Sequence, residues 1–310
     1  MNAPITVVGE ALIDIVVPVV GGPVEHVGGS PANVAVGLSR LGHPTRLATY
    51  FANDPRGRRI ADVMAAESVQ LAAGSDTGDR TSTATALLDE AGVATYEFDL
   101  EWRLDPTPIT VPTDGHLHTG SIAATLAPGS DAVLQIISTA RPHSTISYDP
   151  NVRPALMGTP DDTRPRIERL IAMADVVKAS DQDIHWLYGN IPITEVLERW
   201  ASSGPSICAV THGPEALLVA HAGEQRWYQP RQVAVADTVG AGDSFMAGLI
   251  SGLLDAGLLG GSEARVRLQE YAWGVIQSAV DRALACAAVT VSRPGANPPN
   301  RAELEGERSG

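Results

Sequence analysis

The chain has 310 residues, 44% of them hydrophobic, and its 36 acidic side chains outnumber its 22 basic ones to give a net charge of −14. This apolar fraction is enough for a folded core, so global disorder is excluded. The acidity argues against nucleic acid or an anionic membrane as a partner, because sequence-independent binding of either needs a broad basic surface.

The two cysteines, Cys208 and Cys286, are too few for a disulfide framework, and we expect both to be buried thiols. The first residues do not form a signal peptide, because Glu10, Asp14 and Pro18 interrupt the apolar stretch and no basic region precedes it. No run approaches the roughly 18 apolar residues that a membrane helix needs. We therefore expect a soluble, cytoplasmic protein.

Short apolar runs alternate with amphipathic segments in the first part of the chain, as in repeated strand–helix units. Ser30 is expected to cap the first helix, with Pro31 at its first position. We predict strands at 5–8 and 46–50, an extended piece at 11–17, and helices at 30–42 and 57–66.

Residues 82–98 have a different pattern. Two runs rich in strand-forming residues flank Glu90-Ala91-Gly92, which predicts a β-hairpin. A hairpin does not belong inside a doubly wound sheet, so we expect it in a small, separate sheet.

The strand–helix alternation then resumes. We predict strands at 116–119, 144–148, 175–178, 206–211 and 215–220, with helices near 130–140, 162–174 and 192–202. Towards the C-terminus we predict helices at 241–256 and 263–286, a last strand at 289–291, and a frayed or disordered tail at 298–310.

The glycine pair Gly28-Gly29 stands directly before the helix that begins at Ser30. Such a pair lets the backbone approach a ligand closely and gives the chain a place to flex. Asn33, in the first turn, offers hydrogen-bond donors and acceptors to a polyol. The alternative is that Asn33 only caps its own helix, and these residues alone favour neither interpretation.

A second glycine-rich segment, Gly240-Ala241-Gly242, opens the helix at 241–256. Its free amides and the positive helix end converge on one spot, an anion hole suited to a phosphoryl group. Asp243 follows in the first turn, where a carboxylate can accept a proton from a substrate hydroxyl. An acid here also stabilises the helix dipole, but that alone does not explain the two glycines or the second acid, Asp237. Neither a Walker A pattern nor G-x-G-x-x-G after the first strand is present.

The segments GGSPANVAVGLSRLG and DTVGAGDSFMAGL resemble the two signatures of the ribokinase-like (PfkB-type) carbohydrate kinases. The resemblance implies an α/β fold, a ribokinase-like doubly wound αβα sandwich with a small β-sheet lid. It implies an ATP-dependent phosphotransferase whose lid closes over a sugar and excludes water. The large domain would comprise residues 1–10, 28–81 and 104–297, the lid residues 11–27 and 82–103, and the tail residues 298–310.

The resemblance also implies roles for single residues. Asp243 corresponds to the general base, and Gly240, Ala241 and Gly242 to the anion hole. The positions that would bind the sugar are Asp14, Gly29, Asn33, Arg153 and Arg103, although a surface charge is the alternative for each arginine.

On the nucleotide side, the positions that resemble ATP-binding residues are Lys178, Ser180, Thr211, Gly213, Gly240, Gly242 and Asn297. Asp183 stands where the family has the glutamate of an N-x-x-E motif that organises the waters of Mg²⁺, and Ser180 replaces its asparagine. Asp237 and Ser292 correspond to a monovalent-cation site, for K⁺, in many relatives.

The segments GEALIDIVVP and DPNVRP resemble bacterial fructokinases more than ribokinases or adenosine kinases. Keto-deoxygluconate kinases typically carry a Tyr-x-Arg pair for the carboxylate of a sugar acid. Here Phe98 takes the place of that arginine, which favours a neutral sugar, with fructose first. The alternatives are a 2-keto-3-deoxygluconate kinase, a ribokinase, a nucleoside kinase, or a sensing module without catalysis. Some relatives dimerise through the lid, and valines 16, 17, 19 and 20 favour a homodimer here.

Overall fold

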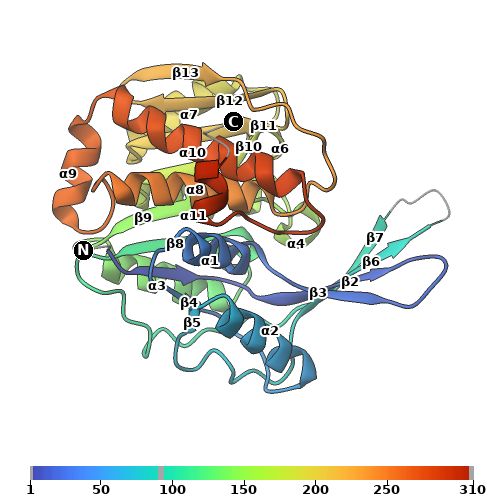
Figure 1. Ribbon diagram of the computed structural model, residues 1–310. Coiled ribbons are helices and arrows are strands. Elements are labelled where there is room, and N and C mark those ends of the chain that lie inside the picture. The colour runs from blue at the N-terminus through green and yellow to red at the C-terminus, as the bar shows by residue number, and fades with distance from the viewer. Residues whose placement is uncertain (1–2, 90–93, 307–310) are drawn as a thin grey trace.

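The computed structural model describes residues 3–89 and 94–306, and its strands form one large and one small sheet (Figure 1). The large sheet has nine strands in the order β13-β12-β11-β10-β9-β8-β1-β4-β5. From β11 to β5 all neighbours are parallel, whereas β12 and β13 are added antiparallel. The strands are β1 (Ile5–Val8), β4 (Thr45–Ala48), β5 (Gln70–Leu71), β8 (His116–Gly120), β9 (Thr145–Asp149), β10 (Val176–Ser180), β11 (Ile207–His212), β12 (Ala216–His221) and β13 (Glu224–Tyr228).

Helices cover both faces of the large sheet. Successive side chains of a strand point to opposite faces, so Val7 of β1 joins one hydrophobic core and Val8 joins the other. One layer holds α1 (Ser30–Arg40), α2 (Pro55–Ala66), α8 (Ala241–Asp255), α9 (Ser262–Glu270) and α10 (Trp273–Val291). The opposite layer holds α3 (Gly129–Ala140), α5 (Pro160–Met173), α6 (Asp181–Tyr188) and α7 (Ile193–Ser203). The predicted αβα sandwich is confirmed.

The small sheet projects from one side of the sandwich (Figure 1). Its strands are β2 (Leu12–Val17), β3 (Val24–Gly28), β6 (Thr83–Leu88) and β7 (Ala94–Asp99), in the order β3-β2-β6-β7. The antiparallel pairing of β6 with β7 confirms the predicted hairpin, although its turn, Glu90-Ala91-Gly92, lies outside the described residues. The division of the chain into a large domain and a lid stays a prediction.

The register of the small sheet decides which side chains share a face. Asp14 of β2 pairs with His26 of β3 and with Ala84 of β6, and Ala84 pairs with Phe98 of β7. These four residues therefore form one row across the sheet.

The C-terminal part of the chain differs from our predictions at three points. Residues 263–286 do not form one helix, because the backbone is extended at Tyr271 and Ala272, between α9 and α10. Residues 289–291 are the end of α10 rather than a strand. The β-branched run favours a strand locally, but in the helix Thr290 lies fully buried and donates a hydrogen bond to Ser244 of α8.

The predicted frayed tail is also wrong for the residues that are described. Residues Arg301–Gly306 form α11, and Leu304 is buried against Leu41 of the α1 end and against α10. Arg301 donates to the carbonyl of Leu41 and forms an ion pair with Asp255.

Helix α10 is long and apolar enough to cross a membrane by length and composition, which the sequence had not led us to expect. Half of its apolar window is buried in the protein, where it packs against α8.

Cys208 and Cys286 are both buried thiols, as predicted, and belong to different core clusters.

Candidate active site

The N-termini of α1 and α8 meet at the carboxylate of Asp243, in the first turn of α8. Ser30 Oγ donates a hydrogen bond to Asp243 Oδ1 at 2.6 Å, and Asn33 Nδ2 donates to Asp243 Oδ2 at 2.8 Å. Asp243 is buried, with 8% of its surface exposed. The two glycine-rich segments, more than 200 residues apart in sequence, thus converge on one acid.

This arrangement corrects two expectations for α1. Gly29 is the N-cap, with a φ of 103°, and no side chain caps the helix. Ser30 is the first helical residue, and its hydroxyl is directed to α8 instead. Asn33 likewise contacts Asp243 rather than capping its own helix, so the local-capping interpretation is wrong. A contact of Asn33 with a sugar stays a prediction.

Gly240, the N-cap residue directly before α8, lies in the left-handed region with a φ of 75°. The amides in the first turn of a helix have no partner within the helix. The amide of Ala241 donates to the carbonyl of Thr238 at 3.3 Å. Gly242 instead lies next to the ammonium of Lys178. A Cβ atom on Gly242 would lie 2.8 Å from Lys178 Nζ, so a larger residue here would displace this ammonium.

Lys178 reaches this position from β10 and is almost fully buried. Its Nζ donates to Oδ2 of Asp149, the last residue of β9, at 2.8 Å. Burial lowers the pKa of Lys178, but Asp149 and the acids Asp183 and Asp243 outweigh it and hold the pKa above its ordinary value. A protonated ammonium therefore lies beside the positive end of α8, which suits an anion.

Asp14 lies on the row of the small sheet that also holds His26. It packs so closely over the end of β3 that a Cβ atom on Gly28 would be 1.9 Å from Asp14 Oδ2. Burial raises the pKa of Asp14 to about 6; the charges of His26 and Arg153 lower it, and that of Asp243 raises it further. The small sheet thus brings a second carboxyl group near Asp243.

Glu10, directly before the small sheet, is a buried acid that we did not single out. Its Oε2 accepts a hydrogen bond from the amide of Ala123 at 3.1 Å. Burial raises the pKa of Glu10 to about 7, against the lowering effects of hydrogen bonds from its own backbone and Ser121 and of the Arg153 charge. Arg153 acts on both Glu10 and Asp14, so this predicted sugar ligand lies near Asp14, another predicted sugar ligand.

Ser180 and Asp183 form a capping box at the start of α6. Asp183 Oδ2 accepts from the amide of Ser180 at 2.7 Å, and Oδ1 accepts from the amide of Val152 at 2.8 Å. These contacts fix the carboxylate between α6 and the segment after β9. Thr211, at the end of β11, contacts the carbonyl of Ala179 through its hydroxyl.

The remaining predicted residues surround the start of α8 or the turn after β11. Gly213, with a φ of 47°, lies in the turn between β11 and β12. Asp237 accepts from the amides of Val239 and Gly295 at 3.0 and 2.8 Å, and these backbone hydrogen bonds hold the pKa of Asp237 below its ordinary value.

Ser292 is the C-cap of α10, and its hydroxyl donates to the carbonyl of Val289. The Asn297 side chain accepts from Arg40 Nη1 at 2.6 Å, so a contact with ATP would require it to leave this partner.

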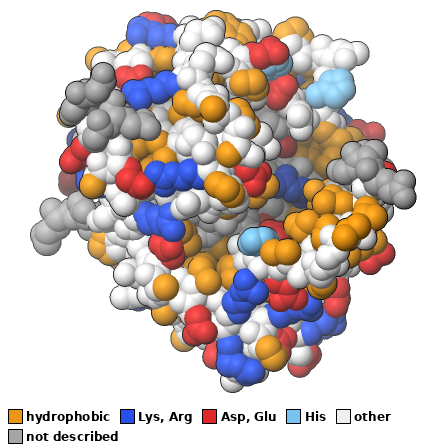
Figure 2. All heavy atoms as spheres, turned by 45° about the vertical axis from the view of Figure 1, so that its right-hand side comes forward, with side chains coloured by type: hydrophobic (Ala, Val, Ile, Leu, Met, Phe, Trp, Pro, Cys, Tyr) orange, Lys and Arg blue, Asp and Glu red, His pale blue; other side chains and the backbone are white. Residues whose placement is uncertain are grey.

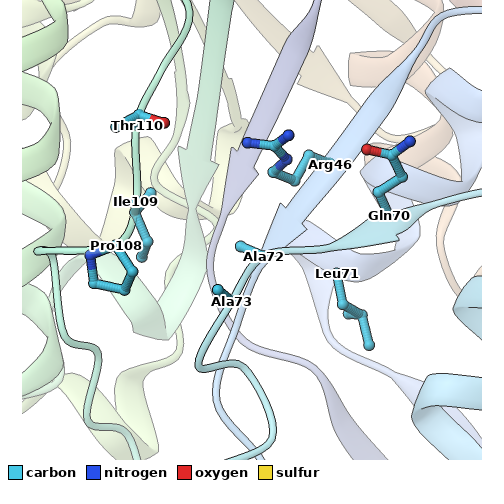
Figure 3. Close-up of a pocket in the computed structure, with 8 residues that line it drawn as sticks. All are labelled: Arg46, Gln70, Leu71, Ala72, Ala73, Pro108, Ile109 and Thr110. Atoms are coloured by element: carbon cyan, nitrogen blue, oxygen red, sulfur yellow. The ribbon is translucent and has the colours of Figure 1, made fainter.

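Arg103 is a predicted site residue that does not join the cluster of site residues around Asp14, Asn33 and Asp243. Within residues 3–89 and 94–306, no hydrogen bond or ion pair joins it to Asp14, Asn33 or Asp243. Instead it lines a cavity of about 260 Å³ with Arg80, Trp102 and Pro128. A cavity of about 230 Å³ at the β5 edge of the large sheet, lined by Arg46, Gln70 and Ile109 (Figure 3), likewise contains none of the cluster residues.

Comparison with known proteins decides the family. Residues 2–303 match the model of the pfkB family carbohydrate kinases. The chain belongs to this family. It is 34% identical over 268 residues to a fructokinase of Klebsiella pneumoniae, which covers 83% of this chain and 87% of that protein.

Solved fructokinases of Vibrio cholerae O395 confirm the ribokinase-like fold of this carbohydrate kinase. One structure, in a fructose-, ADP- and calcium-bound form, has a TM-score of 0.84, 28% identity and 98% coverage of both chains. A double-mutant form bound to fructose, ADP and potassium has a TM-score of 0.83, 27% identity and 99% coverage of both chains.

Sequence reasoning missed three polar residues of this kinase: Glu10, Ser30 and Asp149. Each stands next to a segment that we did examine, yet its importance comes from a partner far along the chain. Only Asp149 carried a signal, because it ends a buried strand and begins the DPNVRP segment. Ser30 had a sufficient local explanation as a helix cap.

Proposed function

We propose that this carbohydrate kinase transfers the γ-phosphoryl group of MgATP to a primary hydroxyl of fructose, with Asp243 as general base. The observation that carries the proposal is the shared position of Asp243 and Lys178 at the N-terminus of α8. A base there can accept the proton of the attacking hydroxyl. A cation beside it can stabilise the phosphoryl group that is transferred. The fructokinase relatives, among them one solved with fructose and ADP, support fructose as the sugar.

On the sugar side, Asp14, Asn33 and the backbone of Gly29 would bind hydroxyl groups. Carboxylates and amides suit polyols, because they accept and donate several hydrogen bonds. Arg153 would add a cation beside Asp14. Ser30 and Asn33 hold both oxygens of Asp243, so the orientation of the base is fixed before a substrate arrives.

In the transfer step, the O–H bond of the sugar breaks as its proton passes to Asp243. A new bond forms between that oxygen and the γ-phosphorus, and the bond from this phosphorus to the bridging oxygen of ADP breaks. The amides of Gly240, Ala241 and Gly242, together with Lys178, would stabilise the charge on the transferred group. Sugar phosphate and ADP leave, and Asp243 releases its proton to solvent.

Metal ions would assist at two places. In the described part of the chain, no group of three or more His, Cys, Asp or Glu side chains is arranged to hold a metal, which fits a Mg²⁺ held by phosphate oxygens and water. Asp183 is our candidate to order those waters, and bound Mg²⁺ supplies positive charge to the phosphates. Asp237 and Ser292 would hold K⁺; replacing KCl by NaCl in the assay tests this, and equal activity would contradict it.

The nucleotide itself would lie along the C-terminal ends of β10 and β11. Ser180, Thr211 and Gly213 end these strands or follow them, and ligands of open α/β sheets bind at this edge. Lys178 would contact the phosphate that is transferred. Asn297 would complete the nucleotide site after release from Arg40.

The small sheet would act as the lid, and we also propose that it pairs with the small sheet of a second copy. By register, Val16, Val24 and Tyr96 share a face, and Val24 and Tyr96 are about half exposed. Figure 2 shows hydrophobic side chains gathered on this side of the molecule. Light scattering should give the mass of a dimer; a monomer at every concentration would contradict the pairing.

The experiment that tests the function is coupled detection of ADP release with a panel of acceptors. We expect the highest kcat/KM for fructose, above ribose, 2-keto-3-deoxygluconate and adenosine. Preference for the sugar acid or the nucleoside would reassign the substrate. Binding of sugars without turnover on any of them would identify a sensing module instead.

The role of Asp243 is tested by Asp243→Asn. Removing a general base should lower kcat by about 10²- to 10⁴-fold, while the thermal unfolding midpoint and fructose binding stay close to those of the unchanged protein. Near-normal turnover would show that another group is the base.

A further inference from the structure

The ion pair of Asp149 and Lys178 is buried at the C-terminal edge of the large sheet. Asp149 ends β9, is fully buried, and contacts Lys178 Nζ at 2.8 Å. A Cβ atom on Gly120, its neighbour in β8, would lie 2.3 Å from the Asp149 carbonyl oxygen. The backbone of Asp149 is thus held tightly on the side opposite to Lys178.

Three acids influence Lys178, but their contacts differ. Asp183 has both oxygens occupied by the amides of Ser180 and Val152, and Asp243 has both occupied by Ser30 and Asn33. Asp149 accepts from the amide of Asn151 through Oδ1 and uses Oδ2 for Lys178. Among the hydrogen bonds of residues 3–89 and 94–306, Asp149 is the acceptor for this ammonium.

A lysine side chain is long and flexible, and its ammonium is a point charge without a preferred direction. A buried ammonium without a partner tends to lose its proton or to move towards water. Lys178 would therefore not stay charged beside Gly242 by packing alone. The contact with Asp149 supplies both the fixed direction and the opposite charge, and it leaves two N–H groups of the ammonium for an anion.

We propose that Asp149 is the positioning residue that holds the Lys178 ammonium at the site of phosphoryl transfer. This inference rests on the proposed function. Asp149 itself would not touch a substrate; it acts through Lys178, which contacts the transferred phosphoryl group together with the first-turn amides of α8. Charge that develops on that group is then met by a cation that needs no rearrangement.

The first test is a cycle of Asp149→Asn, Lys178→Met and the double variant. Lys178→Met should lower kcat about 100-fold, the usual effect of losing one preorganised donor. Asp149→Asn should lower kcat at least about tenfold and change the KM for fructose by less than about twofold, because the proposed sugar ligands lie elsewhere. In the Lys178→Met background, Asp149→Asn should have almost no further effect on kcat.

An equal loss of kcat in both backgrounds would show that Asp149 does not act through Lys178, and would overturn the proposal. If Asp149→Asn does not fold, Asp149→Glu takes its place in the same cycle. It keeps the charge but moves it by one methylene, so it should lower kcat less than Lys178→Met does; unchanged kcat in this variant would also count against a positioning role.

The second test does not depend on turnover. Calorimetric titration without sugar compares a β,γ-methylene analogue of ATP with ADP, in the presence of Mg²⁺. Asp149→Asn and Lys178→Met should each weaken binding of the analogue about tenfold and of ADP less than about twofold, because the ammonium lies where the third phosphate would be. Equal weakening of both nucleotides would overturn the assignment. If no sugar is phosphorylated, the proposed function fails while this measurement still locates the cation.

Asp175→Asn is the matched control. Asp175 is as deeply buried, precedes the same strand β10, and pairs with Arg141 and Arg265 at the opposite end of that strand. This variant should lower the thermal unfolding midpoint and leave kcat and the nucleotide preference unchanged. If it lowers kcat as Asp149→Asn does, the effect is general destabilisation and the positioning role is wrong.

Discussion

At the scale of single residues, this protein places several buried acids within a small volume and distinguishes them by their hydrogen bonds. Asp149 is paired with an ammonium, Asp183 with two amides, and Asp243 with a hydroxyl and an amide side chain. The Glu10 carboxylate is less well stabilised: hydrogen bonds with the amide of Ala123 and with Ser121 do not offset the rise in its pKa that burial causes. Such an acid makes the stability of the fold depend on pH.

Glu10→Gln should therefore stabilise the protein more at alkaline than at acidic pH. The pKa of Glu10 is about 7 in the folded state, against an ordinary value of 4.5. A raised carboxyl pKa contributes stability that is complete below pH 4.5 and is lost as pH rises to 7. Glutamine stays neutral throughout, so its advantage in unfolding free energy should grow by about 2 kcal/mol between pH 5 and pH 8, measured by urea denaturation.

Glu67→Gln is the control for this prediction. Its hydrogen bonds from Arg40 lower the pKa of Glu67, so the group is ionised in both states between pH 5 and pH 8. The difference in unfolding free energy between Glu67→Gln and the unchanged protein should then be constant over this range. A constant difference for Glu10→Gln as well would mean that burial does not raise its pKa.

A second prediction at this scale concerns Gly28. An alanine Cβ would overlap with Asp14 Oδ2, so Gly28→Ala should displace this carboxyl group and raise the KM for fructose at least about tenfold, with a smaller effect on kcat. Gly22→Ala is the control, because a Cβ atom there meets no atom within 4 Å. Steady-state kinetics of both variants test this; equal KM values would remove Asp14 from the sugar site.

At the scale of elements, α10 and α11 show how packing overrides local preference. The run Val289–Val291 favours a strand by propensity, yet it completes a helix that lies along α8 and buries Val289 and Thr290. Helix α11 is too short to be stable alone, and Leu304 gives it a buried contact with the α1–α10 cluster.

Leu304→Ala should accordingly lower the unfolding free energy by about 2 kcal/mol, the lower end for a buried leucine, since the residue lies at the edge of its cluster. Ala302→Ser, at an exposed position of the same helix, should change it by less than about 0.5 kcal/mol. Urea denaturation measures both. A negligible effect of Leu304→Ala would return this segment to the frayed tail that we first expected.

At the scale of the whole molecule, the important feature is the position of the small sheet beside the helix N-termini of the sandwich. In the part of the chain that the structure describes, this sheet connects to the sandwich through the segments around Glu10, Gly28, Ser82 and Leu100. Asp14 lies on it, whereas Asn33 and Asp243 lie on the sandwich. A sugar that contacts all three would bridge the two sheets and couple its binding to their relative position.

Saturating fructose should thus slow hydrogen–deuterium exchange in β2 and β6 of the small sheet and leave β11 and β12 unchanged. The reason is that a bridging ligand favours the closed arrangement and reduces opening of the small sheet. Asp14→Asn should weaken this protection in proportion to its loss of affinity. Equal exchange with and without fructose would argue against a lid.

The sequence by itself determined the strand–helix alternation and the two glycine-rich segments, because these depend on patterns among neighbouring residues. The resemblance of those two segments to a kinase family then implied the αβα sandwich. Buried strands alternate with amphipathic helices, and glycines precede a helix with an acid in its first turn; both patterns are visible without a partner. Lys178 and Asp183 could be named only through the resemblance.

Tertiary structure alone decided which of these residues act on one another. Ser30 reaches Asp243 across 213 positions because the N-termini of α1 and α8 meet. Asp149 reaches Lys178 across 29 positions because the neighbouring parallel strands β9 and β10 bring their C-terminal ends to one edge of the sheet. Tertiary packing also made Val289–Val291 part of a helix where we expected a strand, and it placed Arg103 outside the cluster around Asp14, Asn33 and Asp243. Burial and pairing depend on what the rest of the chain places nearby, and local sequence does not contain that information.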